Sequence, residues 1–422
     1  MASTAVSIAE TCLAAQRASR SLATLGSEVK DGALEAIAQA LESNVDVILE
    51  ANVRDLEVGQ ENGLSDALLD RLALTESRIE AMAAGVRKIA ALPDPVGEVI
   101  DGSRLPNGLS LRRVRVPLGV VAVVYEARPN VTIDAAALCL KSGNAVVLRG
   151  SSSAAHSNAV LAGLAAQAAT DAGLPDGSLS LLAGGGREEL AELATQSGVV
   201  DLIIPRGGEG LKAALKGVAT VPVIYAASGN NHVYVEASAD LQSALEIVLN
   251  AKLQRPGTCN AAEKLLVHRD VAPAFLPTAL RALSDAGVTI HGDEETVLMA
   301  PAGTSVDAAT DIDWDTEYLA LEIATAVVGD TEEAITHVNA HGSGHSEAIV
   351  TGSTAAARAF QLEVDAACVY VNASTRFTDG YEFGMGAEIG NSTQKLHARG
   401  PIGLRELCTF KYLAEGAGQT RP

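Results

Sequence analysis

The feature that most constrains the fold is a run between residues 119 and 227 in which strand-like and helix-like segments alternate. The strand-like segments are short and rich in Val, Ile and Leu, and helical spacing of apolar residues separates them. Strands are predicted at 119–125, 144–150, 178–184, 201–207 and 221–227, and helices at 131–143, at 151–173, from Arg187 and from Glu209. Strict alternation predicts a parallel sheet with right-handed crossovers. Nucleotides bind at the carboxyl ends of such strands.

The flanking segments predict further units. Residues 6–91 have helical periodicity, which predicts a helical layer. Residues 97–117 form two extended halves around Pro106, Asn107 and Gly108, which predicts a protruding hairpin. Beyond residue 230, strands are predicted at 231–237, 263–268, 347–352 and 366–372, with helices at 239–254 and 271–287 and from Thr354, and a last possible strand at 406–413. The fold class is therefore α/β with more than one compact unit.

Composition excludes several classes of protein. The chain has 422 residues, 48% of them hydrophobic, which is enough for a sizeable core. Its net charge of −21 would repel nucleic acid and anionic membrane, because no run concentrates the 31 basic residues. We expect no secretory signal and no membrane helix. Five widely spaced cysteines, an odd number, favour a reducing cytoplasm in which any special cysteine acts as a thiol.

Cys259 differs from the other cysteines. It lies in QRPGTCNAAEKLLVH, between the end of a predicted helix and an apolar strand. Such a loop places the thiol at the rim of a sheet beside exposed backbone amides, where a thiolate is stabilised and reachable. Cys139 and Cys368 lie in apolar stretches that predict burial. A structural cysteine and a nucleophile both remain open for Cys259 on these grounds alone.

Several long stretches resemble known enzymes. PGTCNAAEKLLVH and VVYEARPNVTIDAAALCLKSGNAVVLRGSSSA are similar to the cysteine loop and the first cofactor-binding unit of the aldehyde dehydrogenase superfamily. YEARPNVT, AITHVNAHGSGHSEAIVT and VYVNASTRFTDGYEFGMGAEIGNSTQKLHARGPIGL narrow the resemblance to gamma-glutamyl phosphate reductases, also called glutamate-5-semialdehyde dehydrogenases. The resemblance covers most of residues 116–412. It implies reduction of L-glutamyl 5-phosphate to L-glutamate 5-semialdehyde with NADPH, the second step of proline biosynthesis from glutamate.

The resemblance also implies an aldehyde dehydrogenase-like division of the chain. Residues 1–230 would form an NADP-binding domain with N-terminal helices and a hairpin arm at about 96–117, and 231–372 a catalytic domain carrying Cys259. Residues 373–422 would return to the cofactor domain and contribute to oligomerisation. We expect a homo-oligomer, a dimer or tetramer. The chain would also depend on a separate glutamate 5-kinase, which could contact it.

The implied mechanism uses Cys259 as the nucleophile that forms a thioester and releases phosphate. Donors must face the carbonyl oxygen as negative charge develops there. The Cys259 amide is one candidate, and Asn130 in YEARPN is the other, with a turn residue after Pro129 as its structural alternative. Aldehyde-oxidising relatives carry a water-activating glutamate where this chain has Ala226 in YAASGNNH. The absence of that glutamate favours a phosphate-linked reductase over a hydrolysing dehydrogenase.

The cofactor residues also come from the resemblance, since no G-x-G-x-x-G follows a strand. Arg149, with Ser151 and Ser152, would hold the 2′-phosphate of NADPH, although an arginine ending a strand in solvent is an alternative. The other candidates are the loop Pro205, Arg206, Gly207 and Gly208 near the nicotinamide, and Glu317 on the nicotinamide ribose. A simple turn and an ordinary helix acid are their structural alternatives.

The HGSGHSE segment and nearby cations are candidates for binding the substrate. They are Arg255, Arg206, His341, Ser343, His345 and Ser346. His337, His341 and His345 recur every fourth residue, but Gly342 and Gly344 would break a helix between them, so we expect no metal site. Three other functions remain open: a different acyl phosphate or semialdehyde dehydrogenase, a thiol acyltransferase or hydrolase that pairs Cys259 with a histidine, and a non-catalytic scaffold.

Overall fold

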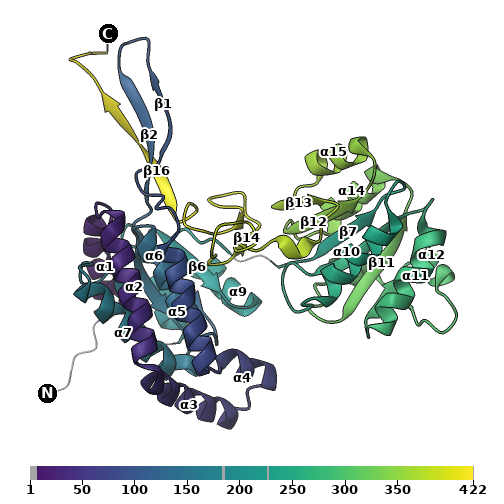
Figure 1. Cartoon of the computed structure of the whole chain (residues 1–422), viewed down its shortest axis with the longest axis horizontal. Helices are drawn as coiled ribbons and strands as arrows, with labels where there is room; N and C mark the ends of the chain where they lie inside the picture. The colour runs from purple at the N-terminus through teal and green to yellow at the C-terminus, as the bar shows by residue number, and fades with distance from the viewer. Residues whose placement is uncertain (1–6, 183–185, 226–227, 422) are drawn as a thin grey trace.

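The computed structural model describes residues 7–182, 186–225 and 228–421. Its elements form two lobes and an extended arm, and residues of the C-terminal segment lie between the lobes (Figure 1). The first lobe contains α1 to α9 with strands β3 to β6, and the second contains β7 to β13 with their helices. Both lobes have their own apolar cores.

The N-terminal part of the first lobe is helical, as predicted. Its helices are α1 (Ile8–Leu22), α2 (Ser27–Ser43), α3 (Val45–Glu61), α4 (Asp66–Leu72) and α5 (Glu76–Ala90). Helix α1 begins with a capping box in which Ser7 and Glu10 bond to each other's backbone. The buried faces of α1, α2 and α5 join the same core as the sheet of this lobe.

That sheet is parallel, as the alternating segments predicted. It has four strands in the order β5-β4-β3-β6: β3 (Val120–Tyr125), β4 (Ala145–Arg149), β5 (Leu179–Leu181) and β6 (Leu202–Arg206). The crossovers are α6 (Asn130–Lys141), α7 (Ala155–Asp171) after the short 3₁₀ helix η1 (Ser152–Ala154), α8 (Arg187–Ala194) and α9 (Glu209–Val218). Strand β3 is buried along its whole length.

The prediction of a strand at 221–227 was wrong for residues 221–225. Residues 226–227 lie outside the described residues. Val223 makes a single parallel bridge to Ile203 on β6. Two hydrogen bonds accompany it, from Ile203 N–H to Pro222 O and from Ile224 N–H to Ile203 O. Pro222 has no N–H to extend a ladder, so the segment forms only a bridge at the edge of the sheet.

The second lobe is built on a seven-stranded sheet in the order β10-β9-β11-β8-β7-β12-β13. Its strands are β7 (Asn231–Val235), β8 (Ala262–His268), β9 (Thr289–Gly292), β10 (Asp307–Ala308), β11 (Glu322–Val328), β12 (Ser346–Val350) and β13 (Cys368–Val371). Every pair of neighbours in it is parallel. The helices are α10 (Leu241–Leu253), α11 (Ala272–Asp285), α12 (Glu294–Met299), α13 (Asp311–Asp315), α14 (Thr331–His341) and α15 (Thr354–Glu363).

Strand β11 was not predicted, although it lies between β9 and β8. The helical alternative for Glu317 was wrong, because residues 316–319 form an irregular loop between α13 and β11. Short apolar runs such as LALEIATAVV suit either element, and only the pairing with β8 and β9 decides between them.

The arm is a three-stranded antiparallel sheet in the order β1-β2-β16. The predicted hairpin is its β1 (Val99–Arg104) and β2 (Ser110–Pro117), and β16 (Cys408–Glu415) pairs with β2 from Cys408 opposite Pro117 to Glu415 opposite Ser110. The arm extends away from both lobes and carries the C-terminus near its tip (Figure 1). Between β13 and β16 lie η2 (Thr375–Phe377) and the short pair β14 (Asn391–Ser392) and β15 (Gly400–Pro401). Among the described helices, none is both long and apolar enough to cross a membrane.

Candidate active site

Cys259 lies in a loop that joins the end of α10 to the start of β8. The residue is partly exposed, and the neighbouring Asn260 is buried. Arg376 holds this loop by donating to Gln254 Oε1 at 2.8 Å and to Thr258 Oγ1 at 3.0 Å. Asn260 donates from Nδ2 to Thr378 O at 2.9 Å. The loop around the thiol is therefore fixed on one side by residues 376–378, which are far away in sequence.

Gly229 and Asn231 fix the other side of the loop. Asn231 Nδ2 donates to the Cys259 carbonyl oxygen at 2.8 Å and to Ala261 O at 2.6 Å. A Cβ atom on Gly229 would lie 1.5 Å from that same carbonyl oxygen. Only glycine allows this approach, so the start of β7 and the cysteine loop pack backbone against backbone.

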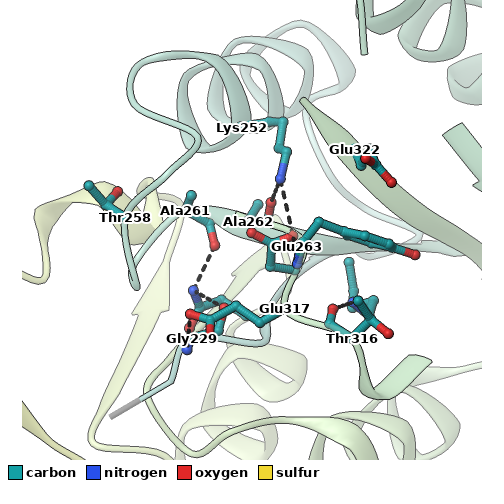
Figure 2. A network of polar contacts seen from close by, with 12 residues as sticks. Gly229, Lys252, Thr258, Ala261, Ala262, Glu263, Thr316, Glu317 and Glu322 are labelled. Carbon is teal, nitrogen blue, oxygen red and sulfur yellow. Dashed lines mark hydrogen bonds and ion pairs between the residues drawn. The ribbon is translucent and has the colours of Figure 1, made fainter. Parts of the chain in front are cut away.

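Glu317 is connected to the same backbone. Its Oε1 accepts from Gly229 N–H at 2.6 Å, as Figure 2 shows. Buried side chains hold both of its neighbours: Lys264 Nζ donates to Thr316 O at 2.8 Å, and Tyr318 N–H donates to Glu263 Oε2 at 3.2 Å. Lys252 in turn donates to Glu263 Oε2 at 3.2 Å. This network places a carboxylate beside the backbone that contacts Cys259.

Four arginines from separate segments influence the charge around the thiol. Burial raises the pKa of Cys259 to about 11, and Arg206 opposes this rise while Glu388 and Glu317 add to it. Burial lowers the pKa of Arg128, and Arg206 and Arg255 lower it further. Burial and Arg255 likewise lower the pKa of Arg376. The backbone amide of Cys259 lowers the pKa of its own thiol, as expected of this loop, but burial outweighs both that amide and Arg206.

The predicted histidine segment, HGSGHSE at 341–347, contacts the residue just before β7. Helix α14 ends at His341, so Gly342 and Gly344 interrupt the helix as predicted. His341 Nδ1 contacts Asp315 Oδ1 at 2.8 Å, and Ser343 Oγ accepts from Asn230 N–H at 2.9 Å.

His345 and Ser346 are buried next to this segment. His345 Nδ1 contacts Ser346 Oγ at 2.7 Å, and that hydroxyl contacts Thr378 Oγ1 at 2.5 Å. Burial lowers the pKa of His345 to about 4, so it is neutral near pH 7. These bonds keep His341 and His345 occupied with partners other than Cys259, which weakens the acyltransferase or hydrolase alternative. In the described ranges, no group of three or more His, Cys, Asp or Glu side chains could hold a metal ion.

The predicted cofactor residues other than Glu317 lie at the carboxyl ends of β4 and β6. Arg149 ends β4 and donates from Nη2 to Gly186 O at 3.2 Å, and Ser151 Oγ contacts Ser153 Oγ at 2.5 Å in the turn that follows, with Ser152 beginning η1. Pro205 and Arg206 end β6. Gly208 N–H, at the start of α9, donates to Glu126 Oε2 at 3.1 Å. A Cβ on Gly207 would lie 2.7 Å from Glu126 Cδ, so the Glu126 side chain packs closely against this glycine.

Asn130 begins α6 and is not a turn residue, so that alternative was wrong. Its Nδ2 donates to Asp134 Oδ2 at 2.9 Å within the first turn of the helix. Burial raises the pKa of Asp134 to about 6. The position expected for the water-activating glutamate, Ala226, lies outside the described residues.

The C-terminal segment contacts both lobes. Arg376 bonds the cysteine loop, and Tyr225 N–H donates to Gln394 Oε1 at 2.7 Å. A Cβ on Gly390 would lie 3.0 Å from Arg206 Nη1, so the backbone at this glycine packs directly on the arginine. This segment therefore brings the end of β6 and the thiol loop into one site.

Comparisons with known proteins agree with this arrangement. Residues 1–310 match the aldehyde dehydrogenase family. The gamma-glutamyl phosphate reductase of Moorella thermoacetica is 56% identical over 407 residues, which cover 96% of this chain and 97% of the relative. The chain belongs to the gamma-glutamyl phosphate reductases. The enzyme of Thermobifida fusca with that name is 54% identical over the same shares of the two chains.

A solved gamma-glutamyl phosphate reductase has the same fold. The crystal structure from Thermotoga maritima is 45% identical, covers 98% of this chain and 99% of its own, and superimposes with a TM-score of 0.95. An engineered glycolyl-CoA reductase with bound NADP⁺ is 16% identical and covers 96% of both chains, with a TM-score of 0.67. The second similarity shows the aldehyde dehydrogenase-like fold alone. The fold class expected from the sequence is confirmed.

Sequence reasoning missed several neighbours of Cys259, namely Arg128, Gly229, Asn231, Asn260 and Arg376. Arg128 and Arg376 lie inside YEARPNVT and VNASTRF, stretches that carried the family resemblance. Asn231 and Gly229 lie in ASGNNH, where two asparagines directly before an apolar strand were the available signal. Apart from Asn260, which directly follows Cys259, none of these positions has a spacing that points to Cys259, because their contacts form only in three dimensions.

Proposed function

We propose that the protein reduces L-glutamyl 5-phosphate to L-glutamate 5-semialdehyde, with NADPH as reductant and release of phosphate. The observation that carries the proposal is the 56% identity to a gamma-glutamyl phosphate reductase over 96% of the chain. The fixed loop around Cys259 supports it, because a nucleophile requires a reproducible position. The enzyme would supply the second step of proline biosynthesis.

In this proposal Cys259 gives up its proton, and the thiolate attacks the acyl carbon. The bond from carbon to the phosphate oxygen breaks, phosphate leaves, and a thioester remains on Cys259. Arg206, which opposes the raised pKa of Cys259, would favour the thiolate, and an anionic substrate beside it and Arg255 would be partly neutralised. The Cys259 amide and Asn130 are the proposed donors to the carbonyl oxygen. When hydride reaches the thioester carbon, the C–S bond breaks and the semialdehyde leaves.

The chain's donors fit a nicotinamide dinucleotide. Arg149, Ser151 and Ser152 at the end of β4 present a guanidinium and two hydroxyls, a set that suits the 2′-phosphate of NADPH. The loop 205–208 at the end of β6 and Glu317 would hold the nicotinamide end. When bound, the cofactor supplies the hydride. This assignment follows the rule that nucleotides bind outside the carboxyl ends of parallel strands.

The deciding experiment runs the reaction in reverse. Glutamate 5-semialdehyde and NADP⁺ are supplied, and the absorbance of NADPH is followed with and without phosphate. Strict dependence on phosphate that is lost in Cys259→Ala supports the proposal. Reduction of NADP⁺ without phosphate would indicate a water-using dehydrogenase, and phosphate-dependent turnover that persists in Cys259→Ala would exclude the thioester.

We also propose that the arm mediates a homo-oligomer, a dimer or tetramer. Its two outer strands, β1 and β16, each pair only with β2 among the described strands. Phe410 and Tyr412 on β16 are 45% and 59% exposed. Unpaired edges with exposed aromatic side chains favour association with another subunit. Light scattering of the purified chain tests this, and a monomer at micromolar concentration would contradict it.

From the resemblance to gamma-glutamyl phosphate reductases we also propose a division into domains at residues 230 and 372 and a separate glutamate 5-kinase. A cytoplasmic location is proposed from the cysteines. The five cysteines are all free thiols, which suits a reducing compartment. Direct transfer of the labile acyl phosphate from the kinase is tested by coupled assays. Equal flux with added kinase and with synthetic acyl phosphate would argue against direct transfer.

A further inference from the structure

Two loops pass close to each other beside the thiol, and one buried carboxylate is bonded from both of them. The cysteine loop runs from the end of α10 to the start of β8, and Glu317 lies in the loop between α13 and β11. A Cβ on Gly257, in the cysteine loop, would lie 3.6 Å from Leu319 O in the second loop. The carboxylate belongs to Glu263 on β8, whose side chain is 0% exposed.

Glu263 Oε2 accepts hydrogen bonds from the supports of both loops. Lys252, in the last turn of α10, donates to it at 3.2 Å and to Ala262 O at 2.9 Å, which closes the base of the cysteine loop (Figure 2). From the other loop, Tyr318 N–H donates to the same oxygen at 3.2 Å. A single oxygen atom therefore joins the base of the cysteine loop to the residue that follows Glu317.

Lys264, the next residue of β8, holds the other side of Glu317. Its Nζ donates to Thr316 O at 2.8 Å and lies 4.8 Å from the centre of the Tyr318 ring, and its side chain is buried. Two consecutive residues of one strand thus bond the backbone before and after Glu317. These bonds leave little freedom to the backbone that carries this carboxylate, whose Oε1 accepts from Gly229 N–H at 2.6 Å.

The backbone just after Tyr318 is strained. Leu319 has a φ of +53°, in the left-handed region that disfavours a residue with a Cβ. Its side chain is 47% exposed, so burial of this leucine does not offset the cost. Strain of this kind persists where surrounding contacts fix the backbone, and it concentrates at functional sites. The strain therefore indicates that bonds to the neighbouring residues specify the position of this loop.

Stability alone does not account for the buried charges. The network contains two buried lysines and one buried glutamate, and Glu263 Oε1 has no hydrogen-bond partner among the described residues. A buried ion pair often stabilises a fold no more than apolar residues of similar volume, and an unpaired buried oxygen costs stability. The bonds of this network end on the backbone at the base of the cysteine loop and on both sides of Glu317. This arrangement favours a role in positioning.

We propose that Glu263, Lys252 and Lys264 are positioning residues that fix Glu317 relative to the Cys259 loop. The inference rests on the proposed function, in which Glu317 holds the nicotinamide end of the cofactor. Hydride transfer to a thioester requires a fixed separation of the two reacting carbons, and a misplacement of about 1 Å can cost about 100-fold in rate. The three residues act through Glu317 and the loop backbone, and not on the reacting atoms.

A double-mutant cycle tests whether Lys264 acts through Glu317. Lys264→Met removes the bond to Thr316 O and leaves Glu263 paired with Lys252, so no buried carboxylate loses its only cation. Turnover in the reverse reaction is measured at saturating substrates for the native chain, Lys264→Met, Glu317→Ala and the double variant. We expect each single variant to lose about tenfold or more, and the double variant to lie within about twofold of Glu317→Ala. Losses that multiply would mean that Lys264 acts independently of Glu317, which would overturn the proposal.

Hydrogen exchange provides a readout that needs neither cofactor nor activity. In cofactor-free protein the Gly229 N–H is protected by its bond to Glu317, so this amide should exchange about tenfold faster in Lys264→Met and in Glu317→Ala. Lys141→Met is the matched control, because Lys141 is also buried and donates to a backbone oxygen, Ala90 O at 2.7 Å, in the first lobe. It should leave Gly229 exchange unchanged. Unchanged exchange in Lys264→Met would also overturn the proposal.

Two further outcomes distinguish this inference from the proposed function. If Gly229 exchange rises in Lys264→Met while Glu317→Ala binds NADPH normally, as followed by fluorescence, the cofactor assignment of Glu317 fails and its positioning is supported. If exchange in α11 rises equally, Lys264→Met has loosened the whole lobe, and Lys252→Met then decides. That variant keeps Lys264 beside Glu263, and its turnover should fall roughly three- to tenfold with exchange in α11 unchanged. Normal turnover in Lys252→Met would overturn the proposal.

Discussion

The two parallel sheets of this protein carry their candidate functional residues at opposite ends of their strands. In the four-stranded sheet, Arg149 and Arg206 stand at carboxyl ends. In the seven-stranded sheet, Cys259 lies before β8, and Gly229 and Asn231 lie at the start of β7. Arg149 and Arg206 therefore have the positions that the carboxyl-end rule predicts for a ligand, whereas the cofactor candidate Glu317, before β11, and the thiol lie at amino ends.

Different residues fix the loops at these two ends. The loops after β4 and β6 lead into helices whose first N–H groups are bonded by side chains: Asp55 accepts from His156 and Ser157, and Glu126 accepts from Gly208. In the cysteine loop, Asn231 bonds the backbone, Arg376 bonds the side chain of Thr258, and Asn260 donates from the loop to Thr378 O. Changes at the two ends should therefore affect catalysis and cofactor binding separately.

The largest expected effect is at the thiol itself. Cys259→Ala should reduce turnover by roughly 10⁴-fold or more, because removal of a covalent nucleophile abolishes the acyl-enzyme route. Binding of NADPH, measured by fluorescence, should be unchanged. Cys12→Ala, in the core of the first lobe, is the control and should remain active. Equal losses in both variants would show that packing and not chemistry is responsible.

Gly229→Ala tests the close packing at the start of β7. The added Cβ would meet the Cys259 carbonyl oxygen, so the cysteine loop must move and turnover should fall about 100-fold or more. Gly163→Ala on α7 meets no atom within 4 Å and should be neutral. Steady-state kinetics with a measurement of the melting temperature distinguishes misplacement from unfolding. Normal kinetics in Gly229→Ala would mean that the loop position is unimportant.

Arg149→Met tests the cofactor end. Loss of a charged donor to the 2′-phosphate should weaken NADPH binding by about 10- to 100-fold, with NADH binding nearly unaffected. Turnover at saturating NADPH should change little, in contrast to Gly229→Ala. A parallel loss of affinity for both cofactors would place Arg149 elsewhere than at the 2′-phosphate.

The smallest effects concern the acidity of the thiol. Since the pKa of Cys259 is raised to about 11 and the thiolate is the reactive form, alkylation of the cofactor-free enzyme should accelerate with rising pH up to that range. Arg206→Met removes a cation that lowers this pKa, so alkylation at pH 8 should slow roughly three- to tenfold. Glu388→Gln removes a carboxylate that raises it and should act in the opposite direction. Mass spectrometry of the Cys259 peptide measures both rates.

Much of the fold was predictable because the signals were local. Alternating apolar segments identified β3, β4 and β6 with their crossovers, and helical periodicity identified α1 to α5. The predictions failed where a local pattern suited two structures. Residues 221–225 look like a strand but contain Pro222, and β11 was hidden in a run that also suits a helix.

Within the candidate site, the residue that the sequence singled out by its own local pattern is Cys259. By itself the sequence determined the α/β class, and through its long motifs it identified the family, because both depend on patterns among residues that are close together in the chain. Only the tertiary structure decided which groups surround the thiol and how acidic it is. Arg376 lies 117 positions after Cys259, and Gly229 lies 30 positions before it. The thiol is buried because the segments that contain these three residues pack together. Contacts and desolvation of this kind are properties of the folded chain.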